Sequence, residues 1–111
     1  MAGGCVHING EFVELDDAKI SIFDTGFLHS DVVYDVTTSW DGYIFKLDKH
    51  LARFKASCEG FRLTNPYSDE ETAKLLAECT VRAGCEDGSF IHMHVTRGEY
   101  AEGSRDPRLC E

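Results

Sequence analysis

The strongest constraint on the fold is a β-hairpin signal in the middle of the chain. Most residues from Val32 to Trp40 are β-branched or aromatic, and a similar pattern returns from Tyr43 to Leu47. Asp41-Gly42 lies between the two runs, and these residue types tolerate the positive φ angles that a two-residue hairpin turn requires. The sequence therefore predicts two antiparallel strands joined by a tight turn.

Two helices are expected directly after this hairpin. Apolar residues recur at gaps of four, three, four and three positions from Leu47 to Phe61, which traces one stripe along a helix that Asp48 can cap. The run Ser68–Glu71 matches a capping box and predicts a second helix, which ends near Gly84. Pro66 marks the break between the two helices.

Shorter strands are expected on both sides of these elements. Residues 4–8 and 11–15 flank Asn9-Gly10, a dipeptide that favours hairpin turns. Residues 18–23 read as a strand followed by a turn at 24–26, and the last strand is expected over residues 89–97.

This order of elements predicts an α+β domain, in which an antiparallel sheet carries two consecutive helices packed on one face. The domain is expected to cover residues 1–98. Residues 99–111 show no regular pattern, and we expect them to form an interdomain loop or tail, as if the chain were cut in mid-course.

The charge balance argues against several classes of partner. The chain has 11 Lys plus Arg against 20 Asp plus Glu, a formal charge of -9, so binding to nucleic acid or to a membrane surface is not expected. Its five cysteines form no CxxC motif and no apolar leader precedes them, which indicates a reducing compartment. We expect a soluble, cytoplasmic protein.

Arg53 is the most informative charged residue. It lies off the apolar stripe of its helix, beside small residues that would let a ligand approach, and a guanidinium is suited to phosphate. His29 and Tyr34 flank the entry to the strong hairpin, where side chains often line clefts. An ordinary solvated arginine, and a core tyrosine at position 34, are the plainer alternatives.

Other constellations point less clearly to chemistry. His92 and His94 alternate onto one strand face, but no third metal ligand is identified and the cysteines lack zinc spacing, so no metal site is expected. His29, Ser30 and Asp31 are the residue types of a hydrolase triad, yet no nucleophile-elbow glycines surround the serine.

The segments 26–36 and 40–54 resemble the class IV (fold-type IV) aminotransferases, which depend on pyridoxal phosphate. The His29-Ser30-Asp31 entry and Tyr34 look most like the (R)-selective amine transaminases, within a group that includes D-amino acid and branched-chain aminotransferases. The resemblance extends from Asn9 to the Thr-Arg-Gly sequence that ends at Gly98. It implies the small N-terminal domain of such an enzyme.

The resemblance also implies roles for individual residues. Arg53 matches the arginine that holds the cofactor phosphate, and Arg108 competes with Arg105 for the position of a mobile arginine that binds the substrate carboxylate. The residues expected to contact substrate are His29, Tyr34, Phe90, His92 and Arg105. The implied partners are a small amino donor, a 2-oxo acid acceptor and a second copy of the protein in a homodimer.

One departure from the family pattern limits what these residues can do. In this family the lysine that forms the Schiff base belongs to the larger C-terminal domain, and none of the chain's five lysines occupies that position. The chain is therefore expected to be the N-terminal half of a transaminase, inactive alone. The alternatives are a non-catalytic, self-associating fragment, or half of a pyridoxal-phosphate lyase such as aminodeoxychorismate lyase.

Overall fold

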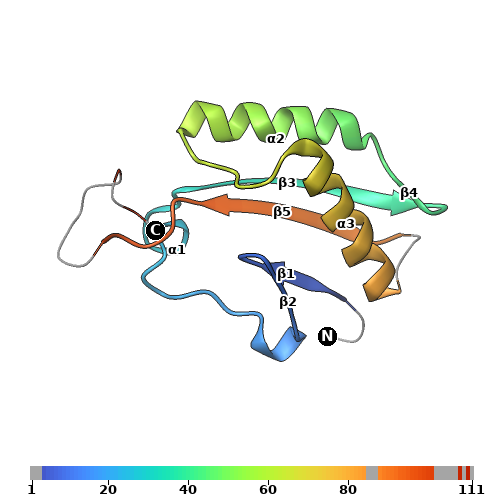
Figure 1. Ribbon diagram of the computed structural model, residues 1–111, viewed down its shortest axis with the longest axis horizontal. Coiled ribbons are helices and arrows are strands. Elements are labelled where there is room, and N and C mark those ends of the chain that lie inside the picture. Colours follow the sequence, from blue (N-terminus) through green and yellow to red (C-terminus); the bar gives the residue numbers. More distant parts are fainter. Residues whose placement is uncertain (1–3, 85–87, 102–107, 109, 111) are drawn as a thin grey trace.

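The structure is a computed structural model that describes residues 4–84, 88–101, 108 and 110. Its centre is an antiparallel three-stranded sheet of order β4-β3-β5 (Figure 1). The strands are β3 (Val32–Trp40), β4 (Tyr43–Ile44) and β5 (Phe90–Thr96). The helices α2 (Leu47–Phe61) and α3 (Asp69–Ala83) lie between β4 and β5 in sequence.

Both helices pack on the same face of this sheet. Leu51 and Phe54 of α2 and Leu76 of α3 join the inward side chains of β3 and β5 in one apolar cluster, which has these members: Val33, Leu51, Phe54, Cys58, Leu63, Leu76, Ile91 and Met93. A continuous cluster of this kind is what holds helices to one side of a sheet. The expected α+β architecture is confirmed.

The inward face of β3 carries three polar side chains besides Val33. Asp35, Thr37 and Ser39 point towards the helices and are nearly fully buried. Tyr34 and Trp40 point to the opposite face of the sheet, which the helices do not cover and which we call the open face, and they are more than half exposed. Each inward polar group has a partner: Thr37 Oγ1 donates to Phe45 O at 2.7 Å, and Ser39 Oγ shares a hydrogen bond with the Oγ of Ser89. These bonds offset the cost of burying the polar side chains.

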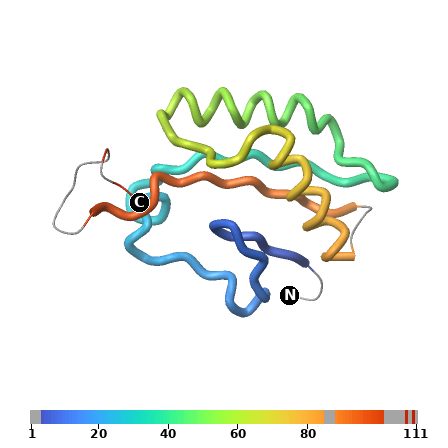
Figure 2. Tube along the Cα trace, viewed as in Figure 1, coloured from blue at the N-terminus to red at the C-terminus, as the bar shows by residue number. Residues whose placement is uncertain are grey.

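The N-terminal hairpin forms its own small sheet. Strands β1 (Val6–Ile8) and β2 (Glu11–Val13) pair around Asn9-Gly10, whose φ angles of 49° and 91° confirm the predicted turn. The hairpin contacts α3, and the Arg82 guanidinium lies 3.9 Å from the centre of the Phe12 ring. Figure 2 shows the hairpin below the main sheet.

The segment between this hairpin and β3 differs from the prediction. Residues 18–23 form no strand, and Ile20, Ile22 and Phe23 are each more than 60% exposed. The alternation suited a strand, but a strand needs a hydrogen-bonded neighbour, and none is present within the described chain. A short 3-10 helix, η1 (Leu15–Asp17), precedes the segment.

Residues 24–26, predicted as a turn, instead open the short helix α1 (Thr25–His29). The side chain of Asp24 caps it by accepting a hydrogen bond from the Gly26 N–H at 2.8 Å. An aspartate at this position satisfies a backbone donor that the helix itself leaves free.

The predicted caps are present in α3 but not in α2. The capping box of α3 is present in full, and Gly84 ends that helix at φ 68°. Asp48, however, does not cap α2: Lys46 occupies the N-cap position at φ 47°, and Asp48 lies in the first turn, where its charge favours the helix dipole. The same left-handed residue ends the predicted strand early, at Ile44.

Among the described residues, no helix has the length and apolar character needed to cross a bilayer.

Candidate functional site

A buried carboxylate organises the charged groups between β3 and α2. Asp35 is 4% exposed, and its Oδ2 accepts a hydrogen bond from Arg53 Nε at 2.7 Å while its Oδ1 accepts one from Arg53 Nη2 at 2.8 Å. His50, one helical turn before Arg53, places its Nδ1 2.6 Å from Asp35 Oδ1. Strand β3 and helix α2 are therefore joined by a bidentate ion pair between Asp35 and Arg53 and by the contact of Asp35 with His50.

The electrostatics of the cluster favour the charged forms. The hydrogen bond from Arg53 lowers the pKa of Asp35 to about 2; burial opposes this shift, and the contact with His50 adds to it. The same hydrogen bond raises the pKa of Arg53 above its ordinary value. Asp35 is ionised and Arg53 is protonated throughout the physiological range.

Arg53 retains the capacity to bind a second anion. Its side chain is 66% exposed although Asp35 engages the Nε and Nη2 edge of the guanidinium. Nη1 has no hydrogen-bond partner among the described residues, so its two N–H groups remain available. Because Asp35 fixes the plane of the guanidinium, a phosphate oxygen could meet a preoriented donor pair. The exposure of Arg53 agrees with its predicted place off the apolar stripe of the helix.

Three of the other predicted site residues lie together on the open face of the sheet. Tyr34 is paired across the strands with His94, Val36 with His92 and Thr38 with Phe90. Tyr34 and Phe90 are 62% and 76% exposed. Successive strand residues alternate between the two faces of a sheet. Tyr34 therefore lies on the open face, and the next residue, Asp35, lies on the opposite face with Arg53.

An aromatic stack runs along this open face. The His94 ring lies 5.5 Å from the Tyr34 ring at an interplanar angle of 16°, and 5.7 Å from the His92 ring at 8°. Burial, followed by the proximity of His92, lowers the pKa of His94. This shift favours the neutral form of His94, whose ring lies between those of Tyr34 and His92, two of the predicted substrate residues.

The edge of β3 beside this segment is open within the described chain. Strand β4 pairs only with Ser39 and Trp40, so residues from Val32 to Val36 have a neighbouring strand on the β5 side alone. A ligand that contacted both Arg53 and Tyr34 could approach along this edge.

His29 and Arg105 are not brought into this group. His29 ends α1, is exposed, and has its ring 6.1 Å from the ring of Tyr100. Arg105 lies outside the described residues. The structure thus unites Tyr34, Phe90 and His92 on one face and places Arg53 on the other side of β3.

The Thr-Arg-Gly sequence at the end of β5 acts as a clamp within the domain. The Arg97 guanidinium donates to both carboxylate oxygens of Asp31 and, at 2.8 Å and 3.3 Å, to the backbone carbonyls of Phe61 and Arg62 at the end of α2. Thr96 Oγ1 donates to Asp24 Oδ2 at 3.0 Å. These contacts fix α1 and the entry to β3.

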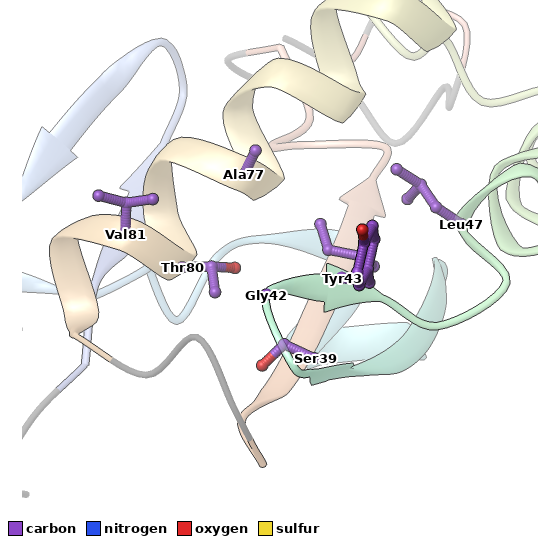
Figure 3. A pocket seen from close by; sticks show the side chains of 8 residues that line it. Ser39, Gly42, Tyr43, Leu47, Ala77, Thr80 and Val81 are labelled. Carbon is purple, nitrogen blue, oxygen red and sulfur yellow. The ribbon is translucent and has the colours of Figure 1, made fainter.

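An open pocket lies elsewhere in the domain. It has a volume of about 470 Å³ and lies between the β3–β4 turn, the start of α2 and α3 (Figure 3). Its lining contains none of the predicted site residues and no charged side chain: Ser39, Gly42, Tyr43, Ile44, Leu47, Ala77, Thr80 and Val81. Within the described residues, no group of three or more His, Cys, Asp or Glu side chains could hold a metal ion.

Sequence reasoning missed Asp35 and His50, and it considered His94 only as a candidate metal ligand beside His92. A signal for Asp35 was available, because an ionisable residue inside a strand of mostly β-branched and aromatic residues requires a partner if it is buried. His50 and Arg53 are three apart on a helix and share a side of it, which makes them natural partners for one carboxylate.

Comparison with known proteins gives consistent results. A sequence profile of the family "Amino-transferase class IV" matches residues 32–110. A protein of Methanocaldococcus jannaschii named "Putative branched-chain-amino-acid aminotransferase" is 34% identical over 105 residues, which are 95% of this chain and 36% of that protein. The D-alanine aminotransferase of Staphylococcus epidermidis is 36% identical over 93 residues, which are 84% of this chain and 33% of that protein.

The fold has solved counterparts as well. A branched-chain amino acid aminotransferase from T.th., solved in complex with N-(5'-phosphopyridoxyl)-L-glutamate, superimposes with a TM-score of 0.82 at 26% identity, over 91% of this chain and 35% of that one. The chain therefore spans about a third of the length of the relatives that it matches.

Proposed function

Because this chain belongs to the class IV aminotransferase family, we propose that it forms the N-terminal half of a transaminase that uses pyridoxal phosphate. Residues 1–98 would be the small domain and residues 99–111 the start of the connection to a C-terminal domain. That larger domain would supply the Schiff-base lysine. The relatives, which are about three times as long, leave room for such a domain.

The main support for this proposal is the orientation and exposure of the Arg53 guanidinium. Its guanidinium is oriented by Asp35 and remains mostly exposed, which suits a group that must hold an incoming phosphate. Asp35 and His50 position Arg53 and do not themselves reach the phosphate in this proposal. When bound, pyridoxal phosphate supplies the electron sink for moving the amino group.

The substrate would be bound on the open face of the sheet. Tyr34 and Phe90 offer exposed aromatic surface, and His92 offers a nitrogen that can hydrogen-bond an acid substrate. His29, from α1, and Arg105 would complete the contacts with the amino donor and the 2-oxo acid. His94 keeps the Tyr34 and His92 rings in place by stacking between them.

The remaining parts of the proposal concern the whole protein. We expect a cytoplasmic homodimer, with no catalysis by the 111 residues alone because a Schiff-base lysine is needed. The exposed apolar side chains of the open face, including Tyr34, Trp40 and Phe90, support a surface that the rest of the enzyme covers.

Amino transfer is the direct test. A form of the protein that includes the proposed C-terminal domain is loaded with pyridoxal phosphate and assayed with amino acids or amines and a 2-oxo acid. We expect transfer, and we expect Arg53→Ala to lose it at low cofactor concentration and to recover it with excess cofactor. Lys55→Ala, which removes a charge from the exposed side of the same helix, is the matched control and should behave as the wild type.

A folded, cofactor-loaded protein without amino transfer would refute the transaminase proposal. Release of pyruvate without an amino acceptor would indicate a lyase such as aminodeoxychorismate lyase instead. Self-association of the isolated chain, measured by light scattering, would support the alternative of a non-catalytic fragment that covers its open face with another copy.

A further inference from the structure

Two cysteines that are distant in sequence lie in contact in the fold. Cys5 directly precedes β1, and Cys79 lies on α3, 74 positions later. Their sulfur atoms are 3.2 Å apart, and both residues are half-buried. A disulfide bond is about 2.05 Å long, so the sulfurs would need to approach by only about 1 Å.

We propose that Cys5 and Cys79 are a site of reversible thiol oxidation, at which a peroxide converts the two thiols into an intramolecular disulfide that joins the N-terminal hairpin to α3. The proposal depends on the meeting of the two sulfurs and is independent of the transaminase proposal.

The chemistry proceeds in two balanced steps. The Cys5 sulfur attacks one oxygen of hydrogen peroxide, the O–O bond breaks, and Cys5 becomes a sulfenic acid as one water leaves. The Cys79 sulfur then attacks the Cys5 sulfur, the S–O bond breaks, and a second water leaves with the disulfide formed. The two thiols together lose two electrons and two protons, and the peroxide is reduced to two waters.

The environments of the two thiols assign these roles. Burial raises the pKa of Cys79 to about 12, and the contact with Cys5 contributes to the shift, so Cys79 is rarely a thiolate near neutral pH. It is therefore a poor first nucleophile, and it reacts second, losing its proton as it attacks the sulfenic acid. The partly exposed Cys5 is left as the first nucleophile.

Oxidation would change how firmly the hairpin is attached. The hairpin is a separate two-stranded sheet, and it is held by noncovalent contacts such as that of Arg82 with Phe12 and that of the His7 ring with the Tyr67 ring, 5.9 Å apart. An isolated two-stranded hairpin is marginally stable. A bond between Cys5 and Cys79 would prevent the hairpin from separating from α3.

Peptide mapping tests the site. The folded, reduced chain is treated with one equivalent of hydrogen peroxide, remaining thiols are alkylated, and the protein is digested with trypsin without reduction. We expect residues 1–19 linked to residues 75–82 within one chain, without a covalent dimer, and we expect dithiothreitol to remove the link. In denaturant, where the fold no longer selects a pair, a mixture of cysteine pairs should replace the single product.

Variants separate placement from general reactivity. Cys5→Ser and Cys79→Ser should each abolish the linked peptide, whereas the matched control Cys110→Ser should retain it. Oxidation should also raise the Tm of the wild type by on the order of 10 °C, because the bond closes a long loop in the unfolded chain. Peroxide treatment should not raise the Tm of Cys5→Ser or Cys79→Ser.

Three results would overturn the proposal. In the first, Cys5 and Cys79 are recovered as separate thiols or as sulfinic acids after peroxide treatment. In the second, Cys79 is linked to another cysteine, such as Cys85. In the third, the 5–79 link occurs only between two chains, seen as a dimer under nonreducing conditions.

Discussion

Replacing Asp35 by asparagine keeps the shape of the side chain and removes the charge that holds Arg53. The carboxylate is 4% exposed and accepts two hydrogen bonds from the guanidinium. The variant should fold, because asparagine remains able to hydrogen-bond. It should be less stable, and the loss should depend on pH in a defined way.

The magnitude follows from the pKa of Asp35. Folding lowers it from an ordinary value of 3.8 to about 2, mainly through the hydrogen bond from Arg53. At about 1.4 kcal/mol per pKa unit this corresponds to about 2.5 kcal/mol as an upper bound. Arg53 is exposed to solvent that screens the pair, so we expect about 1–1.5 kcal/mol.

Because folding lowers the pKa, the contribution is present in full above about pH 5 and is lost as the pH falls towards 2. The free energy of unfolding should be measured in urea at several pH values between 6 and 3 for the wild type and Asp35→Asn. The difference should be about 1–1.5 kcal/mol at pH 6, and about half of it should be gone at pH 3. Asp16→Asn, which changes an exposed carboxylate, is the control and should show little difference.

A difference between wild type and Asp35→Asn that does not change between pH 6 and 3 would contradict this account of the ion pair. So would a difference as large in Asp16→Asn.

Two further substitutions test the clamp at the end of β5, with urea unfolding as the measurement. Arg97→Ala should destabilise the domain by about 2–3 kcal/mol, because half-buried Asp31 and two helix-end carbonyls lose their donor; an effect below about 0.5 kcal/mol would show that the clamp is dispensable. Gly26→Ala should cost about 1–3 kcal/mol, since a Cβ there would lie 2.6 Å from Thr96 Cγ2. The control is Gly60→Ala, on an open part of α2, which should stabilise the domain by about 0.5–1 kcal/mol; if both alanine variants behave alike, the close packing at Gly26 is not the cause.

The sequence was sufficient where structure is decided by nearby residues. The turn at Asn9-Gly10, the capping box at Ser68 and the end of α3 at Gly84 each depend on a few consecutive residues, and each is present. The two helices on one face of an antiparallel sheet followed from the order of the elements.

Features that depend on distant partners were not predictable in the same way. Tyr34 and Trp40 of β3 face outwards because the alternate residues Asp35 and Ser39 find partners on the inward side, on α2 and beside β5. Residues 18–23 have the alternation of a strand but no neighbouring strand within the described chain.

In the candidate site, too, features set by local spacing were predictable and features set by distant contacts were not. The position of Arg53 off the apolar stripe followed from helical spacing, and its exposure agrees. The attachment of Arg53 to Asp35 required knowing which residue of β3 lies beneath the helix. The roles of Arg53, Tyr34, Phe90 and His92 in cofactor and substrate binding remain predictions.

We propose that Arg53 binds the phosphate of the cofactor. The most direct measurement compares the affinities for pyridoxal phosphate and for pyridoxal, which lacks the phosphate, in the protein that carries the proposed C-terminal domain. We predict that Arg53→Ala lowers the preference for the phosphorylated form by about 10- to 100-fold while Lys55→Ala leaves it intact. An unchanged preference in a folded Arg53→Ala protein would contradict the claim.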